Sequence, residues 1–138
     1  MPKKILVAFD GSEPSKRAFR FALELAQPFR AQVSVVSVAQ PPEPPSMVES
    51  SAMREAATDQ FVAEFEWMRS QADAMGVEVA THVAFGHPAE QIVKQADERE
   101  SDLIVMGHRG KSRIQEWLLG SVSKRVLSYA ACSVTIVR

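Results

Sequence analysis

The chain has 138 residues, of which 46% are hydrophobic and 24% charged, and its net charge at pH 7 is −1. A chain of this length is most economically one domain with a substantial buried core, so we expect a single domain over residues 1–138. The near-neutral charge argues against nucleic acid as the main partner, because nucleic-acid binding usually requires a strongly basic face. No apolar run approaches the ~20 residues of a membrane helix, and the N-terminus carries no signal-peptide pattern. The only cysteine, Cys132, suits a reducing compartment, so a cytoplasmic protein without membrane insertion is expected.

Five apolar runs rich in β-branched residues alternate with four helical patterns. In chain order, we expect a strand at 4–9, a helix at 13–27, a strand at 32–38, a helix at 50–75, a strand at 77–83, a helix at 88–99, a strand at 102–106, a helix at 121–130 and a strand at 133–137. Ser12 is the expected N-cap of the first helix, and Pro28 is its expected end. The core-facing stripe of this helix comprises Ala18, Ala22, Leu25, Ala26 and Phe29. The second helix carries a stripe of Met53, Ala57, Phe61, Phe65, Met68, Ala72 and Met75.

The strict alternation of strands and helices predicts an α/β fold, a single-domain open parallel five-stranded sheet with helices on both faces. After Lys4 and Asp102 at their first positions, the runs 4–9 and 102–106 are continuously apolar, as central strands covered on both faces are. The runs 77–83 and 133–137 alternate apolar and polar residues and are expected at the edges. The expected strand order is 3-2-1-4-5, which places a ligand site beyond the carboxyl ends of strands 1 and 4.

The segment 107–121, GHRGKSRIQEWLLGS, carries the strongest functional signal. Its glycines follow the spacing G-x2-G-x9-G, and Ser121 comes directly after the third. Gly107 and Gly110 have no Cβ atom, so N–H groups there can approach an oxyanion closely. Gly120 and Ser121 stand at an expected helix N-terminus, where unpaired N–H groups favour phosphate. The segment is therefore predicted to present two anion-binding ends, enough to hold a polyphosphate.

Ordinary turn glycines followed by an N-cap serine are the competing interpretation of this segment. That interpretation is favoured for any single glycine, whereas the joint spacing at a strand-to-helix junction favours phosphate binding. Two better-known phosphate motifs do not fit. A Walker A loop would need glycine in place of Val105, and no G-x-G-x-x-G follows the first strand.

In these features the chain resembles the universal stress proteins, whose ATP-binding branch carries the signature G-x2-G-x9-G-[ST]. The likeness continues in the run GSVSKRVL at 120–127, in ILVAFDGS at 5–12, in Gly86-His87-Pro88 and in DLIVMG at 102–107. It covers residues 3–138 and implies an adenine nucleotide alpha hydrolase-like fold with the same strand order. For function, it implies a nucleotide-liganded stress-response module that binds ATP, or AMP or ADP, together with Mg²⁺.

The resemblance also implies roles for individual residues. Asp10 would lie on the ribose or metal side, although its position alone is equally well explained by a turn aspartate that caps the first helix. The backbone of Val38 would meet the adenine edge, and Ala8 and Phe9 would line the floor of the base pocket. The implied nucleotide site comprises Asp10, Val38, Met106, Gly107, Arg109, Gly110, Gly120, Ser121, Val122 and Ser123.

Three histidines occur in the chain, His82, His87 and His108, and none is spaced with a second ligand as metal sites require. His108 and Arg109 could touch phosphate oxygens, although they occupy the variable x2 positions of the glycine motif. Lys111 is close enough to reach phosphate, but a lysine at such a position is more often a solvated loop charge.

No catalytic constellation is evident. The first strand is followed by Asp10-Gly11-Ser12-Glu13, and not by the H-x-G-H or S-G-G-x-D-S motifs of nucleotidyl-transferring and adenylating enzymes. No Ser/His/Asp or Cys/His arrangement can be argued from spacing, and nothing supplies both a positioned water and a charge-stabilising group for ATP hydrolysis. We therefore expect no catalytic residue and at most a very slow ATPase. Two alternatives remain open: an interaction module with a vestigial pocket, and a slow ATPase or autophosphorylating protein.

The last strand predicts a homodimer. No residue follows Arg138 in the sequence that could cover the outer edge of the strand at 133–137, and that strand contains neither proline nor an inward charge. Val134 and Ile136 could meet their symmetry mates across a two-fold axis in an isologous interface. Members of the family that the chain resembles commonly pair in this way.

Overall fold

A computed structural model describes residues 2–39, 47–109 and 119–138. Its centre is a five-stranded parallel sheet in the order β3-β2-β1-β4-β5. The strands are β1 (Lys4–Ala8), β2 (Gln32–Ala39), β3 (Val79–Phe85), β4 (Leu103–Gly107) and β5 (Ser133–Val137). The helices are α1 (Glu13–Phe29), α2 (Met47–Ala74), α3 (Pro88–Glu98) and α4 (Ser121–Tyr129). The α/β class, the parallel sheet and the strand order predicted from the sequence are confirmed.

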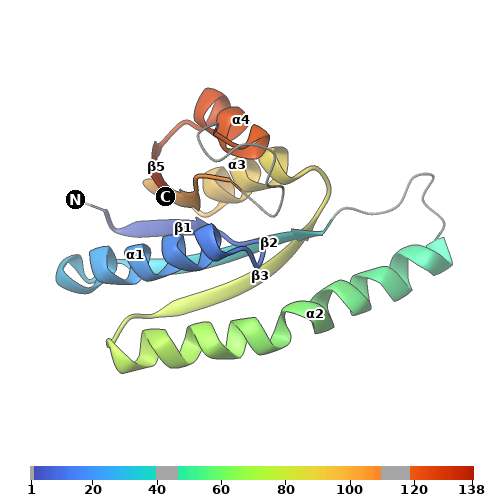
Figure 1. Ribbon diagram of the computed structural model, residues 1–138, viewed down its shortest axis with the longest axis horizontal. Helices are drawn as coiled ribbons and strands as arrows, with labels where there is room; N and C mark the ends of the chain where they lie inside the picture. The colour runs from blue at the N-terminus through green and yellow to red at the C-terminus, as the bar shows by residue number, and fades with distance from the viewer. Residues whose placement is uncertain (1, 40–46, 110–118) are drawn as a thin grey trace.

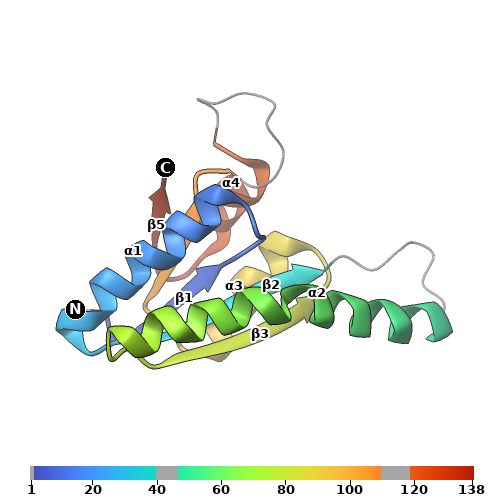
Figure 2. The ribbon, with the colours of Figure 1, turned by 60° about the horizontal axis from the view of Figure 1, so that its bottom comes forward.

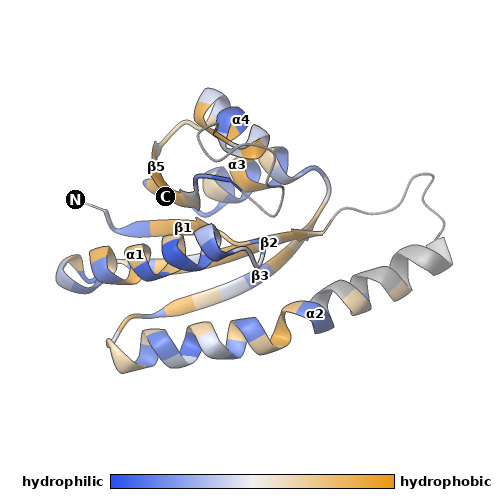
Figure 3. Ribbon diagram, in the orientation of Figure 1, coloured by the Kyte–Doolittle hydropathy of each residue, from blue (hydrophilic) through white to orange (hydrophobic). Residues whose placement is uncertain are grey.

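Two layers of helices cover the sheet, with α1 and α2 on one face and α3 and α4 on the other (Figures 1 and 2). Successive side chains of a strand point to opposite faces, so a central strand must be apolar throughout. In β1, Ile5 and Val7 join the core under α1 and α2, whereas Leu6 and Ala8 join the core under α3 and α4. In Figure 3, β1 is accordingly hydrophobic after a hydrophilic start.

Helix α1 begins as predicted and ends later than predicted. The Ser12 hydroxyl accepts a hydrogen bond of 3.3 Å from the Ser15 N–H, so Ser12 is the N-cap. The prediction that Pro28 ends the helix is wrong, because the helix continues to Phe29. A proline in the last turn removes only one helical hydrogen bond. The helix ends at Arg30, whose left-handed conformation (φ 53°) lets its N–H donate back into the last turn.

The predicted core stripe of α1 is correct for its small residues and wrong at its end. Three of its members are fully buried: Ala18, Ala22 and Ala26. Phe29, which was predicted to face the core, is 37% exposed in the last turn. The large core residues of α1 are instead Phe19 and Leu23, and the ring of Phe19 lies 5.6 Å from that of Trp67 on α2. Phe19 packs against α2, and the apolar pattern of α1 alone does not show this contact.

Most residues of the apolar stripe predicted for α2 are buried, where the structure describes their side chains. Four of these side chains are buried: Phe61, Phe65, Met68 and Ala72. Met75, just after the helix, packs partly against the same core, while Met53 and Ala57 lie outside the described side chains. Figures 1 and 2 both show the N-terminal part of α2 extending beyond the end of the sheet.

Strand β3 starts two residues later than predicted. The Val77 N–H donates to the Ala72 carbonyl oxygen over 2.9 Å and so closes the end of α2. Gly76, with a φ of 69°, makes this turn possible. Val77 is still buried, which explains its apolar character, but its N–H is engaged with the helix and does not join the sheet.

Candidate functional site

The carboxyl ends of β1 and β4 lie side by side at the centre of the sheet, because β1 pairs with β2 on one side and with β4 on the other. From this edge the chain enters α1 on one face of the sheet and α4 on the opposite face. Such a divergence of connections opens a crevice beyond the strand ends, which is the usual ligand site of open α/β sheets. The structure thus brings the residues after β1 and β4 to one place, as the sequence predicted.

Asp10 stands in the turn between β1 and α1. Its Oδ1 atom accepts a hydrogen bond of 2.9 Å from the Ser12 N–H, and Gly11 follows with a φ of 85°. This is an Asx-type turn, so the aspartate has the structural role that its position suggested. The side chain is nonetheless exposed at the crevice, so its carboxylate is accessible to a ligand.

Gly107, the last residue of β4, is explained by close packing. A Cβ atom at this position would lie 2.8 Å from the Pro14 Cβ and 2.9 Å from the Pro14 carbonyl carbon. Only glycine therefore allows β4 to end directly against the first turn of α1. The contact with Pro14 explains this glycine without a ligand. From the sequence, Gly107 was expected instead to let a backbone N–H approach an anion closely.

Gly120 joins the start of α4 to the end of β4. It is the N-cap residue (φ −60°, ψ 153°), and its N–H donates to the His108 carbonyl oxygen over 2.9 Å. A Cβ atom on Gly120 would lie 3.1 Å from the Arg109 Cα, tighter than most real contacts. The backbones of the two segments thus touch, and a side chain at 120 would push them apart.

No side chain among the described residues caps the first turn of α4. Helix α1 has its cap in the Ser12 hydroxyl, whereas the N-cap of α4 is a glycine. The first helical acceptor in α4 is the Gly120 carbonyl oxygen, which receives the Lys124 N–H at 3.0 Å. Ser121 and Val122 precede that bond, so their N–H groups belong to the unpaired end of the helix. Ser121 itself is exposed.

Ser123 ties α4 to the sheet. Its hydroxyl donates a hydrogen bond of 3.0 Å to the Gly107 carbonyl oxygen, and only 2% of the residue is exposed. Ser123 was expected to belong to the nucleotide site. In the structure its proton is committed to the backbone of β4, so the residue acts first as a positioning group for the helix N-terminus.

His108 and Arg109 continue β4 toward the loop. His108 is buried, and its N–H donates to the Val137 carbonyl oxygen over 2.7 Å. Arg109 is half-buried, and its Nη1 atom is shielded from solvent and has no hydrogen-bond partner among the described residues. Two further predicted positions, Gly110 and Lys111, lie outside the described residues.

Val38 presents backbone groups to the crevice. The Phe9 N–H donates to the Val36 carbonyl oxygen, so the main-chain groups of Val36 face β1. Alternate residues of a strand face the same neighbour, so those of Val38 face this side too. The register ends at Ala8 opposite Val36, and the chain then turns away near Asp10. The N–H and C=O of Val38 therefore point toward the space after β1.

The apolar residues of the predicted site divide between the two faces of the sheet. Met106, Val38 and Val122 all belong to the core under α3 and α4, as does Ala8. Phe9 is 2% exposed and belongs to the opposite core under α1 and α2. Its side chain therefore does not share a floor with Ala8, contrary to the expectation from the sequence.

Ser37 is a polar group that the sequence analysis missed. It is fully buried in β2 next to Val38, and its Oγ atom has no partner in the described part of the chain. Ser37 is the second serine of the otherwise apolar run VSVVSVA. The alternation of side chains along a strand did not by itself indicate that this serine would be fully buried.

The described residues hold no group of three or more His, Cys, Asp or Glu side chains that could bind a metal ion. Partial burial and the nearby charge of Arg99 lower the pKa of His82, which lies on the edge strand β3. His87 is the N-cap residue of α3 and makes no side-chain capping bond. A metal at Asp10 would therefore depend on this one carboxylate and on oxygens of a bound ligand.

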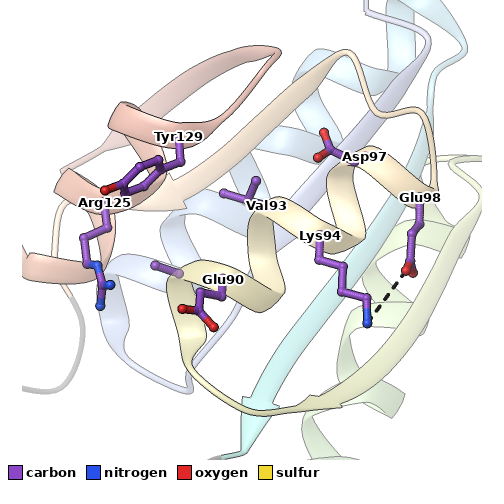
Figure 4. Close-up of a pocket in the computed structure, with 8 residues that line it drawn as sticks. Glu90, Val93, Lys94, Asp97, Glu98, Arg125 and Tyr129 are labelled. Atoms are coloured by element: carbon purple, nitrogen blue, oxygen red, sulfur yellow. Dashed lines mark ion pairs between the residues drawn. The ribbon is translucent and has the colours of Figure 1, made fainter.

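A separate groove of about 530 Å³ lies between the outer faces of α3 and α4 (Figure 4). Val93 lies at its centre, Arg125 and Tyr129 lie on the α4 side, and Lys94 pairs with Glu98 over 3.9 Å on the α3 side. None of the predicted site residues lines this groove.

Among the helices that the structure describes, none combines the length and the apolar character needed to cross a membrane.

Comparison with known proteins identifies a family. The sequence pattern of the universal stress protein family matches residues 1–138. A universal stress protein of Thermus aquaticus is 38% identical, and universal stress protein YxiE of Bacillus subtilis is 34% identical, each over 100% of both chains. Among solved structures, a universal stress protein in complex with cAMP is 26% identical, with a TM-score of 0.77 over 99% of this chain and 97% of that one.

Proposed function

This chain belongs to the universal stress protein family, and we propose that it binds ATP as a nucleotide-liganded module of the stress response. The main supporting observation is the N-terminus of α4, which no described side chain caps and which is held against the end of β4 where the crevice opens. Unpaired N–H groups and the positive end of the helix dipole favour phosphate. The related structure that contains cAMP supports an adenine nucleotide as the ligand.

The proposal gives each part of the crevice a separate task. The phosphates lie at the N–H groups of Ser121 and Val122, while Gly110, predicted from the glycine spacing, lies outside the described residues. Val38 offers its main-chain N–H and C=O to the adenine edge, because these groups point past the end of β1. Asp10 offers an exposed carboxylate to the ribose hydroxyls or to Mg²⁺. The apolar side chains of Met106 and Val122 contribute to the wall beneath.

Mg²⁺ would accompany the nucleotide and neutralise part of the phosphate charge. It keeps several waters and commonly binds through one or two carboxylates plus substrate phosphates. A single exposed carboxylate at Asp10 fits that pattern, whereas a site made wholly of protein ligands does not.

Binding, and not turnover, is the proposed activity. Hydrolysis requires a positioned water and groups that stabilise charge in the transition state. Among the described residues of the crevice, Asp10 accepts the Ser12 N–H with one oxygen and is assigned to the ribose or Mg²⁺, while Ser123 donates to a backbone carbonyl, so neither is assigned to position a water. The nucleotide therefore acts as a ligand or signal, and the expected steady-state rate is far below the roughly 1–100 per second of kinases.

The proposal includes a homodimer and a cytoplasmic location. β5 lies at an edge of the sheet and pairs only with β4 in the described part of the chain, so a second copy could pair with its outer edge. The single cysteine, Cys132, supports a reducing compartment.

Ser121 allows a direct test by titration calorimetry with ATP and Mg²⁺. Ser121→Pro removes the first N–H of α4, and proline is well tolerated at the first position of a helix. The preceding Gly120 already has the extended conformation that a following proline requires. Ser121→Ala is the matched control, since it removes the hydroxyl and keeps the N–H.

Loss of one charge-assisted hydrogen bond, worth about 1.5–3 kcal/mol, should weaken ATP binding roughly tenfold or more in Ser121→Pro. Ser121→Ala should change the affinity much less, and both variants should melt close to the wild type. A native mass spectrum of freshly purified protein should show retained nucleotide. Wild-type protein that neither retains nucleotide nor binds added ATP would overturn the proposal.

A further inference from the structure

We propose that Arg109 makes this site selective for nucleotides that carry more than one phosphate. The inference rests on the proposed function and goes beyond it, because an adenine site alone does not distinguish ATP from AMP. Its basis is a cationic side chain whose backbone lies against Gly120, the N-cap of α4, and which has no anionic partner among the described residues.

The backbone around Arg109 is held on both sides. The preceding residue, His108, donates its N–H to Val137 over 2.7 Å and accepts the Gly120 N–H over 2.9 Å. The Arg109 Cα packs against Gly120 so closely that a Cβ atom there would be only 3.1 Å away. Arg109 therefore starts from a fixed point directly beside the N-cap of α4.

The guanidinium of Arg109 is incompletely satisfied. Its Nη1 atom is shielded from solvent, yet no described residue accepts its hydrogen bonds. A guanidinium cannot lose its charge in a protein, so a shielded and unpaired N–H of this group is unfavourable until an anion reaches it. Its planar fork of donors matches phosphate oxygens in particular. A bound phosphate is the partner that the chemistry of the crevice supplies.

The distal phosphates are the ones that fit this position. In the proposed pose the ribose lies at Asp10, which follows β1, and the phosphate chain runs toward the N-terminus of α4. The α-phosphate is bonded to the ribose and is held near it. Arg109 lies against Gly120, the N-cap of α4 toward which this phosphate chain would run, so the β- and γ-phosphates would be the ones to reach it. AMP has no group that extends so far.

The experiment measures the affinities for ATP, ADP and AMP, with and without Mg²⁺, for four proteins. These are the wild type, Arg109→Met, Arg109→Lys and Arg125→Met. Methionine keeps an unbranched stem and removes the charge, while lysine keeps the charge without the fork. Arg125→Met is the matched control, because Arg125 is an exposed arginine of α4 that lines the groove on its outer face.

We expect the wild type to bind ATP at least about tenfold more tightly than AMP, and Arg109→Met to lose about tenfold in ATP affinity with less than a twofold change for AMP. Arg109→Lys should lie between, and Arg125→Met should match the wild type. Equal ATP and AMP affinities in the wild type would overturn the inference even if Arg109→Met failed to fold. An equal loss for both nucleotides in Arg109→Met would also overturn it while leaving nucleotide binding intact. Absence of any wild-type binding would instead reject the proposed function itself.

Discussion

The Ser123 hydroxyl donates a hydrogen bond of 3.0 Å to the carbonyl oxygen of Gly107, and this contact joins the first turn of α4 to the last residue of β4. Ser123 is only 2% exposed, so the bond is shielded from water. The N-terminus of α4 is consequently fixed relative to the end of the sheet. A phosphate site made of helix N–H groups requires such fixation, because its donors must be in place before the ligand arrives.

Ser123→Ala should lower both stability and nucleotide affinity. The variant leaves the buried Gly107 carbonyl without its donor, which should cost about 1–3 kcal/mol in the free energy of unfolding measured with urea. Ser128→Ala is the control on the same helix, because the Ser128 hydroxyl donates to the Lys124 carbonyl oxygen at an exposed position. That change should stay within about 0.5 kcal/mol. Equal effects of the two substitutions would show that the Ser123 bond does not fix α4.

Gly107 and Gly76 should respond differently to substitution, because the two glycines are required for different reasons. Gly107→Ala places a Cβ atom 2.8 Å from Pro14 and should cost about 1–3 kcal/mol of unfolding free energy through overpacking. Gly76 has a φ of 69° and nothing within 4 Å of its Cβ position. Gly76→Asn should therefore cost less than about 1 kcal/mol, since asparagine tolerates left-handed backbone.

Chemical denaturation of Gly107→Ala, Gly107→Asn and Gly76→Asn tests this difference. Both substitutions at 107 should be destabilising, and the asparagine variant should be the worse because it is larger. A Gly107→Asn protein as stable as Gly76→Asn would show that β4 and α1 can move apart at little cost.

The sequence predicted the strand order because hydrophobic patterning reports how many faces of a strand are covered. From Ile5 to Phe9 the run is apolar on both faces, and β1 is central. It could not predict the end of α1 at Arg30, because a proline in the last turn is tolerated when the chain beyond it can close the helix. It also could not place Phe29, which continues the apolar stripe of α1 in the sequence but is 37% exposed in the last turn.

The candidate site was predictable in its location and less so in its internal contacts. The G-x2-G-x9-G spacing correctly led to the junction of β4 and α4. The contact between Gly107 and Pro14 joins residues far apart in the chain, so no local pattern contains it. The same holds for the bond from Ser123 to Gly107, which assigns the hydroxyl a positioning role.

Asp10→Asn should separate the structural role of Asp10 from its proposed ligand role. Asparagine keeps a side-chain oxygen that can accept the Ser12 N–H, so the turn should persist and the melting temperature should change little. The charge is lost, so binding of ATP with Mg²⁺ should weaken, and the dependence of affinity on Mg²⁺ should shrink if the carboxylate serves the metal. Asp10→Ala removes the turn bond as well and should lower stability by about 0.5–1.5 kcal/mol.

Calorimetric titrations with and without Mg²⁺, together with thermal melts, check both parts of this prediction. Unchanged affinity for ATP with Mg²⁺ in a folded Asp10→Asn protein would show that Asp10 only stabilises its turn and does not bind the ligand.

The outer edge of β5 should be the contact of a homodimer. Val137 accepts the His108 N–H, so its main-chain groups face β4. Alternate residues face the same way, so Thr135 also faces β4, whereas the N–H and C=O of Ile136 point to the open edge. Ile136→Pro therefore removes a donor from the edge, while Thr135→Pro removes one from the sheet of the monomer itself.

Light scattering after size-exclusion chromatography should show a wild-type dimer and a shift of Ile136→Pro toward monomer. Ile136→Ala is the matched control: it also loses the side chain that packs against the core under α3 and α4, but it keeps the N–H. It should remain more dimeric than Ile136→Pro at equal concentration. Thr135→Pro should instead lower the stability of the fold, because it breaks the pairing of β4 with β5. A wild-type protein that stays monomeric at high micromolar concentration, with and without ATP, would refute the pairing. Equal dimer fractions for Ile136→Pro and Ile136→Ala would show that main-chain hydrogen bonds at this edge do not hold the dimer together.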